Sequence, residues 1–225
     1  MFKKATLLFL FMTISATTYG QMNDFDITLF VGSPQGDFRD NLDRTAVGIN
    51  GSVAFAIPSS SVQVGAELGI MTYGSDTRRE NFNPNIPEVR VRVNTSYDIF
   101  TGHLFLRYEA PGGVVRPYID GLVGFNYLFT ETKIQDNNDF DEIASDTNFD
   151  DTAFSYGIGG GLKFKVADTG TNQYMINLKT RYLIGSEAAY LQPGSLEVVN
   201  GSLVFDASNS TTNLLTIHLG LTVKF

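Results

Sequence analysis

Twelve titratable side chains lie on strand-like segments whose other face is apolar, and these residues could do chemistry. Ten of them are carboxylates and cations: Asp26, Glu67, Arg107, Glu109, Asp120, Lys163, Lys165, Lys179, Arg181 and Lys224. The other two are the only histidines of the chain, His103 and His218. Opposite charges that face one narrow space can line a path for ions. They can also pair with one another and close that space, because an unpaired buried charge is costly.

We predict the closed arrangement, which we call the lumen charge network. The strand pattern described below predicts a small barrel, and the bore of such a barrel is just wide enough for side chains to fill. In this network the expected partners are Glu67 with Arg107, Asp120 with Lys163 or Lys165, and Lys224 with Asp26. A gated path for ions is the alternative that the same residues leave open.

The histidines raise the hypothesis of an enzyme, such as a lipid deacylase, an acyltransferase or a protease. A general base needs a partner within about 3 Å. Strand parity puts His103 and His218 on the polar face, each in the middle of its strand and on opposite walls of an eight-stranded barrel. We therefore predict structural histidines, no catalytic residue and no enzyme. A serine or an acid beside either histidine would favour the enzyme again.

The segment 131–152 carries eight acidic residues and one lysine, Lys133. Its stretch Asp136–Asp141 offers oxygen ligands at near-alternate positions, as calcium loops do. It lacks the glycine and the distal glutamate of an EF-hand loop, so we predict a solvated acidic loop and no metal or cofactor site. Weak bridging of this loop to lipopolysaccharide phosphates by divalent cations is the alternative. The glycines of 157–161 are expected to leave room for long inward side chains such as Arg181.

The elements that position these residues are best seen in the last segment. From Leu215 to Phe225 every second residue is apolar, and the residues between are mostly polar. Period-two alternation is typical of a strand with one apolar face, and about 9–11 such residues cross a bilayer in a tilted barrel strand. The terminal Phe225 resembles the insertion signal of outer-membrane barrels.

Eight such segments follow one another along the chain. They are 25–32, 45–57, 62–73, 96–109, 116–130, 153–166, 173–185 and 213–225. Short connections rich in turn residues alternate with long polar ones at 33–44, 74–95, 131–152 and 186–212. The sequence therefore predicts an all-β fold, an eight-stranded antiparallel transmembrane β-barrel with short periplasmic turns and long external loops.

Aromatic residues on the apolar parity fall near the two expected ends of the strands. The predicted girdles contain Tyr108, Tyr127, Phe129, Phe154, Tyr156, Phe164, Tyr174 and Tyr182. Rings at both interfaces are typical of membrane barrels. A soluble barrel would instead bury the aliphatic face, so the charges on the opposite face favour a membrane barrel.

The amino-terminal residues are typical of a secretory signal. Lys3 and Lys4 precede an apolar run that is too short for a membrane helix, and small residues end it at Gly20. We predict a removed signal peptide over residues 1–20 and a single barrel domain over 21–225. Without the signal, 14 basic residues face 24 acidic ones, a net charge of −10, which disfavours nucleic acid as a partner. The chain has no cysteine, so backbone pairing must hold the fold.

The chain resembles the small OmpA-like and OmpW-like outer-membrane barrels common in Bacteroidota. The resemblance is carried by Gly20-Gln21, residues 32–38, Arg116-Pro117-Tyr118, residues 121–124 and Lys224-Phe225. It implies an integral outer-membrane protein of a Gram-negative bacterium, inserted by the barrel-insertion machinery, and no shared catalytic motif.

Taken together, the residues and the resemblance predict a monomer with a structural or surface-interaction role. Its expected partners are outer-membrane lipid, lipopolysaccharide and an external ligand at segments 74–95, 131–152 and 186–212. A narrow pore for small or apolar solutes is the second hypothesis, and a lipid-modifying enzyme is the third.

Overall fold

The computed structural model describes residues 23–83, 86–136, 142–199 and 202–225. The predicted signal peptide and its cleavage after Gly20 lie outside these residues, as do Asp139 and Asp141 of the acidic segment. No helix in the described ranges is long and apolar enough to cross a membrane.

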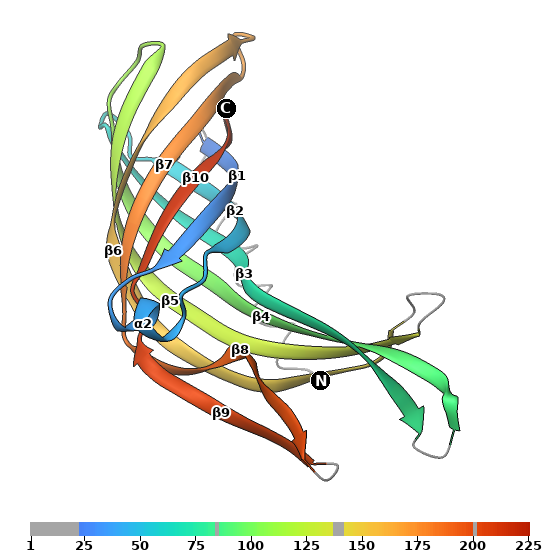
Figure 1. Cartoon of the computed structure of the whole chain (residues 1–225). Coiled ribbons are helices and arrows are strands. Elements are labelled where there is room, and N and C mark those ends of the chain that lie inside the picture. Colours follow the sequence, from blue (N-terminus) through green and yellow to red (C-terminus); the bar gives the residue numbers. More distant parts are fainter. Residues whose placement is uncertain (1–22, 84–85, 137–141, 200–201) are drawn as a thin grey trace, which may run out of the picture.

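Eight strands form a closed antiparallel barrel, as the sequence predicts (Figure 1). They are β1 (Asn23–Pro34), β2 (Ala46–Ala56), β3 (Val62–Asn83), β4 (Ile86–Glu109), β5 (Val115–Asp136), β6 (Glu142–Asp168), β7 (Gln173–Gly185) and β10 (Leu214–Lys224). Each strand pairs with its neighbours in the chain, except that β7 pairs with β10 across the intervening segment. The pairing of β1 with β10 closes the barrel and leaves its wall without a free edge.

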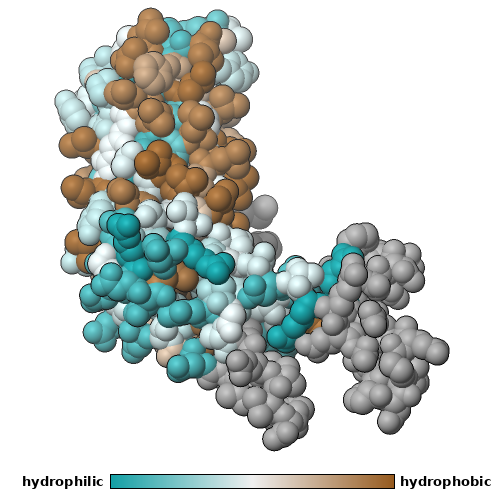
Figure 2. Space-filling model, in the orientation of Figure 1, coloured by the Kyte–Doolittle hydropathy of each residue, from teal (hydrophilic) through white to brown (hydrophobic). Residues whose placement is uncertain are grey.

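The barrel is apolar outside and polar inside. On β7 the outward residues Tyr174, Ile176, Leu178, Tyr182 and Ile184 are 39–44% exposed, whereas the inward Asn177, Lys179 and Arg181 are at most 2% exposed. Strict period-two alternation places every second side chain on the same face. We call the outward apolar residues of the eight strands the belt, and Figure 2 shows the belt over the upper body of the molecule.

Short turns connect the strands at one end of the barrel, which we call the turn end. Between β4 and β5 the chain reverses through Gly112 and Gly113, whose φ angles of 74° and 90° favour glycine. Between β6 and β7 the Gly170 backbone N–H donates to the Asp168 carboxylate, and Lys165 lies 3.1 Å from it. Both contacts hold the pKa of Asp168 below its ordinary value.

At the opposite end, which we call the hairpin end, the connections are long, as predicted, but most of their residues form paired strands and not irregular loops. Segments 74–95 and 131–152 mostly continue the strands β3, β4, β5 and β6 well past the belt, and the β4–β5 register runs on as far as Val91 and Asp136. Segment 186–212 forms a second sheet of β8 (Glu187–Val199) and β9 (Ser202–Thr211). Most of these residues lack the apolar alternation of the belt, with Val89, Val91 and Val93 as an exception. Backbone pairing with a neighbouring strand satisfies their N–H and C=O groups equally well.

The extended parts of β3–β6 form a projecting sheet that we call the wing, over residues 74–83, 86–97, 130–136 and 142–152 (Figure 1). Within the described ranges β3 pairs with β2 only as far as Thr72, and β6 pairs with β7 only from Ser155 onward. The wing therefore has two open edges, unlike the closed wall of the barrel.

A compact apolar cluster covers the mouth of the barrel at the hairpin end. It is made by the short helix α2 (Asp37–Asn41) and by β8, which we call the cap together with β9. Phe38, Leu42, Ala188, Tyr190, Leu191, Tyr73 and Tyr97 are each at most 3% exposed. Phe38 meets the edge of Tyr190 with ring centroids 5.0 Å apart, and the Tyr73 hydroxyl donates to the Leu191 carbonyl at 3.1 Å. The cap thus belongs to the same apolar core as the barrel wall at the hairpin end.

Candidate functional site

The lumen between the cap and the turn end holds three linked groups of charges. Nearest the turn end, the Lys163 ammonium donates to Asp24 at 2.6 Å and to Glu109 at 2.7 Å. Lys224 lies 3.0 Å from Glu109 and 3.3 Å from Asp24. Two lysines and two carboxylates from four different strands therefore meet in one cluster, and Arg116 lies 3.8 Å from Glu109 at its edge.

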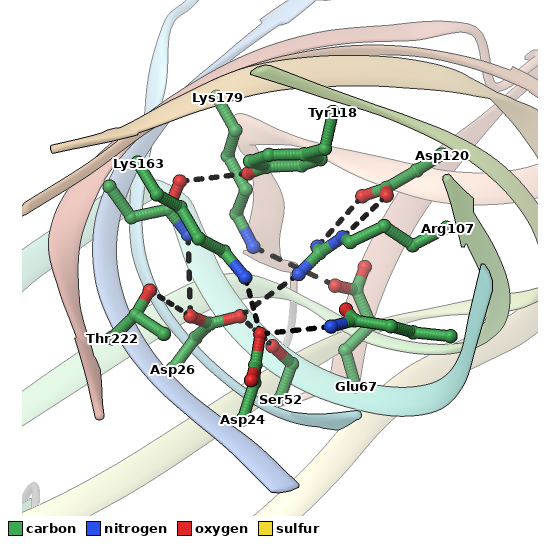
Figure 3. Close-up of polar contacts among 12 residues, drawn as sticks. Asp24, Asp26, Ser52, Glu67, Arg107, Tyr118, Asp120, Lys163, Lys179 and Thr222 are labelled. Carbon is green, nitrogen blue, oxygen red and sulfur yellow. Dashed lines mark hydrogen bonds and ion pairs between the residues drawn. The ribbon is translucent and has the colours of Figure 1, made fainter. Parts of the chain in front are cut away.

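The middle group is centred on Arg107, which is fully buried. Its guanidinium donates twice to Asp120, at 2.7 and 2.9 Å, and lies 3.6 Å from Asp26 (Figure 3). It also lies over the ring of Tyr118, with 4.1 Å between the guanidinium carbon and the ring centroid. The Tyr118 hydroxyl donates in turn to Asn177 at 2.8 Å. A paired, bidentate geometry of this kind is what a buried arginine requires.

The group nearest the hairpin end joins Glu67 to the cations of β7. Arg181 donates to Glu67, and Lys179 lies 3.8 Å from the other oxygen of that carboxylate. The second terminal nitrogen of Arg181 lies 3.5 Å from Asp120, which links this group to the middle one. Lys179 donates to Asn50 across the lumen at 3.2 Å.

The three predicted pairings of the network are wrong, although nearly all of the predicted residues lie in the lumen. The β3–β4 register sets His103 opposite Glu67 and puts Gln63 opposite Arg107. Arg107 lies directly opposite Asp120 on β5, so Asp120 is not free to pair with Lys163 or Lys165. Lys224 is opposite Asp24, and Asp26 is opposite Thr222. Parity predicts which face a side chain occupies, but register decides its partner.

Lys165 is the one predicted member that lies outside the network. A register irregularity between Lys165 and Ala167 ends the regular alternation of β6 at the turn end. Its ammonium lies 3.1 Å from Asp168, and the two side chains are 29% and 38% exposed. An exposed pair of this kind contributes little to stability.

Several residues of the lumen are absent from the predicted network. Asp24 lies two positions before Asp26 and so on the same face, but β1 begins at Asn23 and not at Phe25. Arg116 and Tyr118 share the parity of Asp120 and are also buried. The polar partners Ser52, Gln63, Asn177 and Thr222 complete the network. Strand parity alone could have found all of them.

The inward glycines make room for the long side chains, as predicted. A Cβ at Gly159 would lie 2.6 Å from Cγ of Arg181, and one at Gly161 would lie 2.6 Å from the ring of Tyr118. Both clashes are closer than van der Waals contact allows.

The predicted girdle residues lie on the outer surface. Tyr108, Phe154, Tyr156, Tyr174 and Tyr182 are 39–55% exposed, and Tyr127, Phe129 and Phe164 are partly exposed. Phe225 is half exposed at the turn end.

A serine and an acid do lie beside His103, which is the arrangement that would favour an enzyme. Its Nε2 lies 3.1 Å from the Ser155 hydroxyl, and its Nδ1 lies 3.9 Å from Glu67. The second distance is too long for a hydrogen bond, and Arg181 already occupies that oxygen of Glu67. His218, by contrast, has a threonine hydroxyl at each ring nitrogen, Thr28 at 3.2 Å and Thr216 at 2.9 Å.

The space around these histidines is too small for a substrate. His103, His218, Glu67 and Arg181 line one cavity of about 10 Å³, although the histidines come from opposite walls. That volume is about what a single water molecule needs. Ser155 is fully buried and does not line this cavity. The trio of Ser155, His103 and Glu67 is therefore a buried polar contact with no room for an acyl group.

Replacing Ser155 with alanine should accordingly cost about 1 kcal/mol of unfolding free energy, the typical net value of one hydrogen bond. A fluorophosphonate, which labels activated serines, should leave the folded wild-type barrel unlabelled. The check is urea unfolding of both proteins together with mass spectrometry after exposure to the reagent. Labelling at Ser155 that is lost in the alanine variant would contradict this interpretation.

In the described part of the acidic segment 131–152, the structure places no group of residues suited to hold a metal. Asp146 and Asp150 are exposed, and the Asp151 carboxylate accepts from the Ala189 backbone N–H of the cap at 2.8 Å. At least one acid of this segment therefore has a role in the fold.

Comparisons with known proteins show similarity to small membrane barrels in solved structures. The Neisserial surface protein A is 10% identical, with 92% of this chain and 96% of that chain covered and a TM-score of 0.46. Ail, the attachment invasion locus protein of Yersinia pestis, is 14% identical, with 92% and 100% covered and a TM-score of 0.43. OprG of Pseudomonas aeruginosa is 13% identical, with 92% and 96% covered and a TM-score of 0.40.

No protein-family model matches the chain, and no curated protein matches it either. At identities this low the similarity concerns the fold alone. The resemblance to barrels of Bacteroidota stays a prediction.

Proposed function

We propose that the chain is a closed outer-membrane barrel that acts through the surface of its hairpin end. The observation that carries the proposal is the inside-out distribution of side chains. Apolar residues such as Ile119 and Ile158 are 66% and 72% exposed on the outer wall, while Lys163 and Arg107 are fully buried within it. Water would disfavour so large an apolar surface, and lipid would favour it.

Closure of the lumen is supported by two layers of different chemistry. The layer inside the lumen is the charge network, in which each lysine and arginine has a carboxylate partner. The layer at the hairpin end is the apolar core of the cap, with Tyr190 and Leu191 almost fully buried over the mouth. A solute would have to break both layers to pass, so a structural or surface-interaction role is favoured over a pore.

In this proposal the turn end faces the periplasm, and the hairpin end faces the outside of a Gram-negative cell. Short periplasmic turns and long external hairpins are typical of outer-membrane barrels. The wing and the cap then form the external surface, with exposed acids such as Asp146 and Asp150. Their expected partners are lipopolysaccharide and an external ligand, and the protein acts as a monomer without enzymatic activity.

Single-channel recording of the refolded barrel in a planar bilayer tests the closed lumen. We expect no stable conductance steps from the wild type or from the variants Glu67→Gln and Asp120→Asn, because the cap blocks the mouth in all three. Heat-modifiable migration on gels provides the control that each protein is folded. Steps in the wild type that change in the variants would instead favour the narrow pore.

A further inference from the structure

A polar surface pocket lies beside the connection between β1 and β2. It has a volume of about 150 Å³ and is lined by Ser33, Pro34, Arg39, Leu42, Asp43, Arg44 and Thr45. A cavity of about this volume holds a molecule the size of benzene. The charge network and the cap do not use these side chains, with the exception of Leu42, whose buried part belongs to the cap core.

The charges of the pocket are two guanidinium groups and one carboxylate. Neither Arg39 nor Arg44 has a side-chain hydrogen bond or an ion pair in the part of the chain that the structure describes. Asp37 and Asp40, the acids of α2, do not line the pocket. Arg39, Arg44 and Asp43 are all exposed, so the two cations and the carboxylate are accessible to a ligand that carries a phosphate and an amine.

The pocket borders the belt. Arg44 precedes the outward Val47, which is 64% exposed, by three positions, and Ser33 follows the outward Val31, which is 43% exposed. In Figure 2 the hydrophilic surface of this region lies directly against the hydrophobic one. A ligand seated here would therefore have its polar part in the pocket and an apolar part along the barrel wall.

We propose that this pocket binds a phosphoethanolamine head group, the phosphate by Arg39 and Arg44 and the ammonium by Asp43. Guanidinium groups match phosphate oxygens in pairs, and a carboxylate accepts from an ammonium. The inference rests on the proposed membrane location, since it is the membrane that brings this group to the belt. This head group occurs both on phospholipids and on modified lipopolysaccharide, so two kinds of molecule carry the chemistry that the pocket recognises.

The test measures lipid retention by native mass spectrometry on the barrel refolded in a non-ionic detergent. The probes are short-chain phosphatidylethanolamine, phosphatidylcholine and phosphatidylglycerol. We expect the wild type to retain the ethanolamine lipid best, and the double variant Arg39→Gln/Arg44→Gln to bind it about tenfold more weakly. Asp43→Asn should remove the preference for ethanolamine over choline and leave phosphatidylglycerol binding in place.

Lys133→Gln is the control, because Lys133 is a partly exposed cation of the hairpin end that pairs with Glu131 at 3.4 Å outside the pocket. Its lipid retention should equal that of the wild type. Equal retention by the wild type and the arginine double variant, with both shown to be folded by heat-modifiable migration, would overturn the proposal. So would an unchanged ethanolamine preference in Asp43→Asn.

A second arm distinguishes the two sources of the group. Lipopolysaccharide with and without phosphoethanolamine is offered in place of the phospholipid, and retention of only the modified form identifies lipopolysaccharide as the source. Retention of phosphatidylethanolamine alone identifies the phospholipid. The measurement is made in detergent and does not involve conductance, so a lumen that conducts would contradict the proposed closure and leave the pocket result unaffected.

Discussion

Replacing Arg107 with alanine should lower the free energy of unfolding by about 3–5 kcal/mol, the cost of breaking a buried ion pair by removing one partner. The change leaves Asp120 without its two charge-assisted hydrogen bonds and takes from Asp26 a cation 3.6 Å away. It also removes the stacking over Tyr118. Urea unfolding of the refolded barrel in lipid vesicles, followed by far-ultraviolet circular dichroism, measures the effect.

Two further variants separate the contribution of the unpaired buried charge to the loss of stability from the contribution of lost packing. Arg107→Leu/Asp120→Leu removes both partners, so it should recover much of the loss, because paired apolar replacements of buried ion pairs are often neutral. Lys165→Gln removes a cation from an exposed pair and should change stability by about 0–1 kcal/mol. An Arg107→Ala barrel as stable as Lys165→Gln would mean that water already solvates the middle of the lumen, which would favour a path for ions.

The barrel could be predicted from the sequence because its environment imposes a simple rule on each strand. On β7 and β10 every outward position is apolar except Thr180. The predicted limits of these two strands agree with the observed ones within one residue. Parity alone was therefore sufficient to place Asp26, Glu67, Asp120 and Arg181 inside the wall.

The partners within the lumen could not be predicted in the same way. Register depends on the length of each turn, and a shift of a few residues exchanges one inward neighbour for another. Long side chains also cross the lumen: Lys163 on β6 meets Asp24 on β1, a strand three positions away around the wall. Such contacts depend on the diameter of the closed barrel, which no single strand encodes.

The wing and the cap were missed for a different reason. Residues 74–83 and 130–136 lack the apolar alternation by which strands were recognised, although they continue paired strands. The buried residues Tyr190 and Leu191 are neighbours on β8 and follow no period-two pattern, because the cap packs on the mouth of the barrel and not on its wall. In the sequence, the only indication of the cap was the presence of apolar residues such as Tyr190 and Leu191 within an otherwise polar connection.

Replacing Tyr190 with alanine should release the cap while the barrel stays folded. The phenol is 1% exposed, it meets Phe38 edge to face, and its hydroxyl lies 2.9 Å from that of Ser210. Truncation of a buried aromatic residue costs about 3–5 kcal/mol. That loss should concentrate in the cap, because the belt strands are held by continuous backbone pairing that Tyr190 does not touch. Limited proteolysis should then cut within 187–211, and heat-modifiable migration should persist.

The neighbouring Gln192→Ala provides the control, since Gln192 lies on the same strand and donates to Ser208 at 2.8 Å but is only partly buried. Its cap should resist the protease as the wild type does. If Tyr190→Ala lost the barrel and the cap together, the two would form one cooperative unit, and cap opening without unfolding would be ruled out. If the cap alone is released, the charge network is the only layer of closure left in the same variant. Absence of conductance in the planar bilayer would then mean that the charge network alone blocks the lumen, whereas new conductance steps would mean that the cap blocks it.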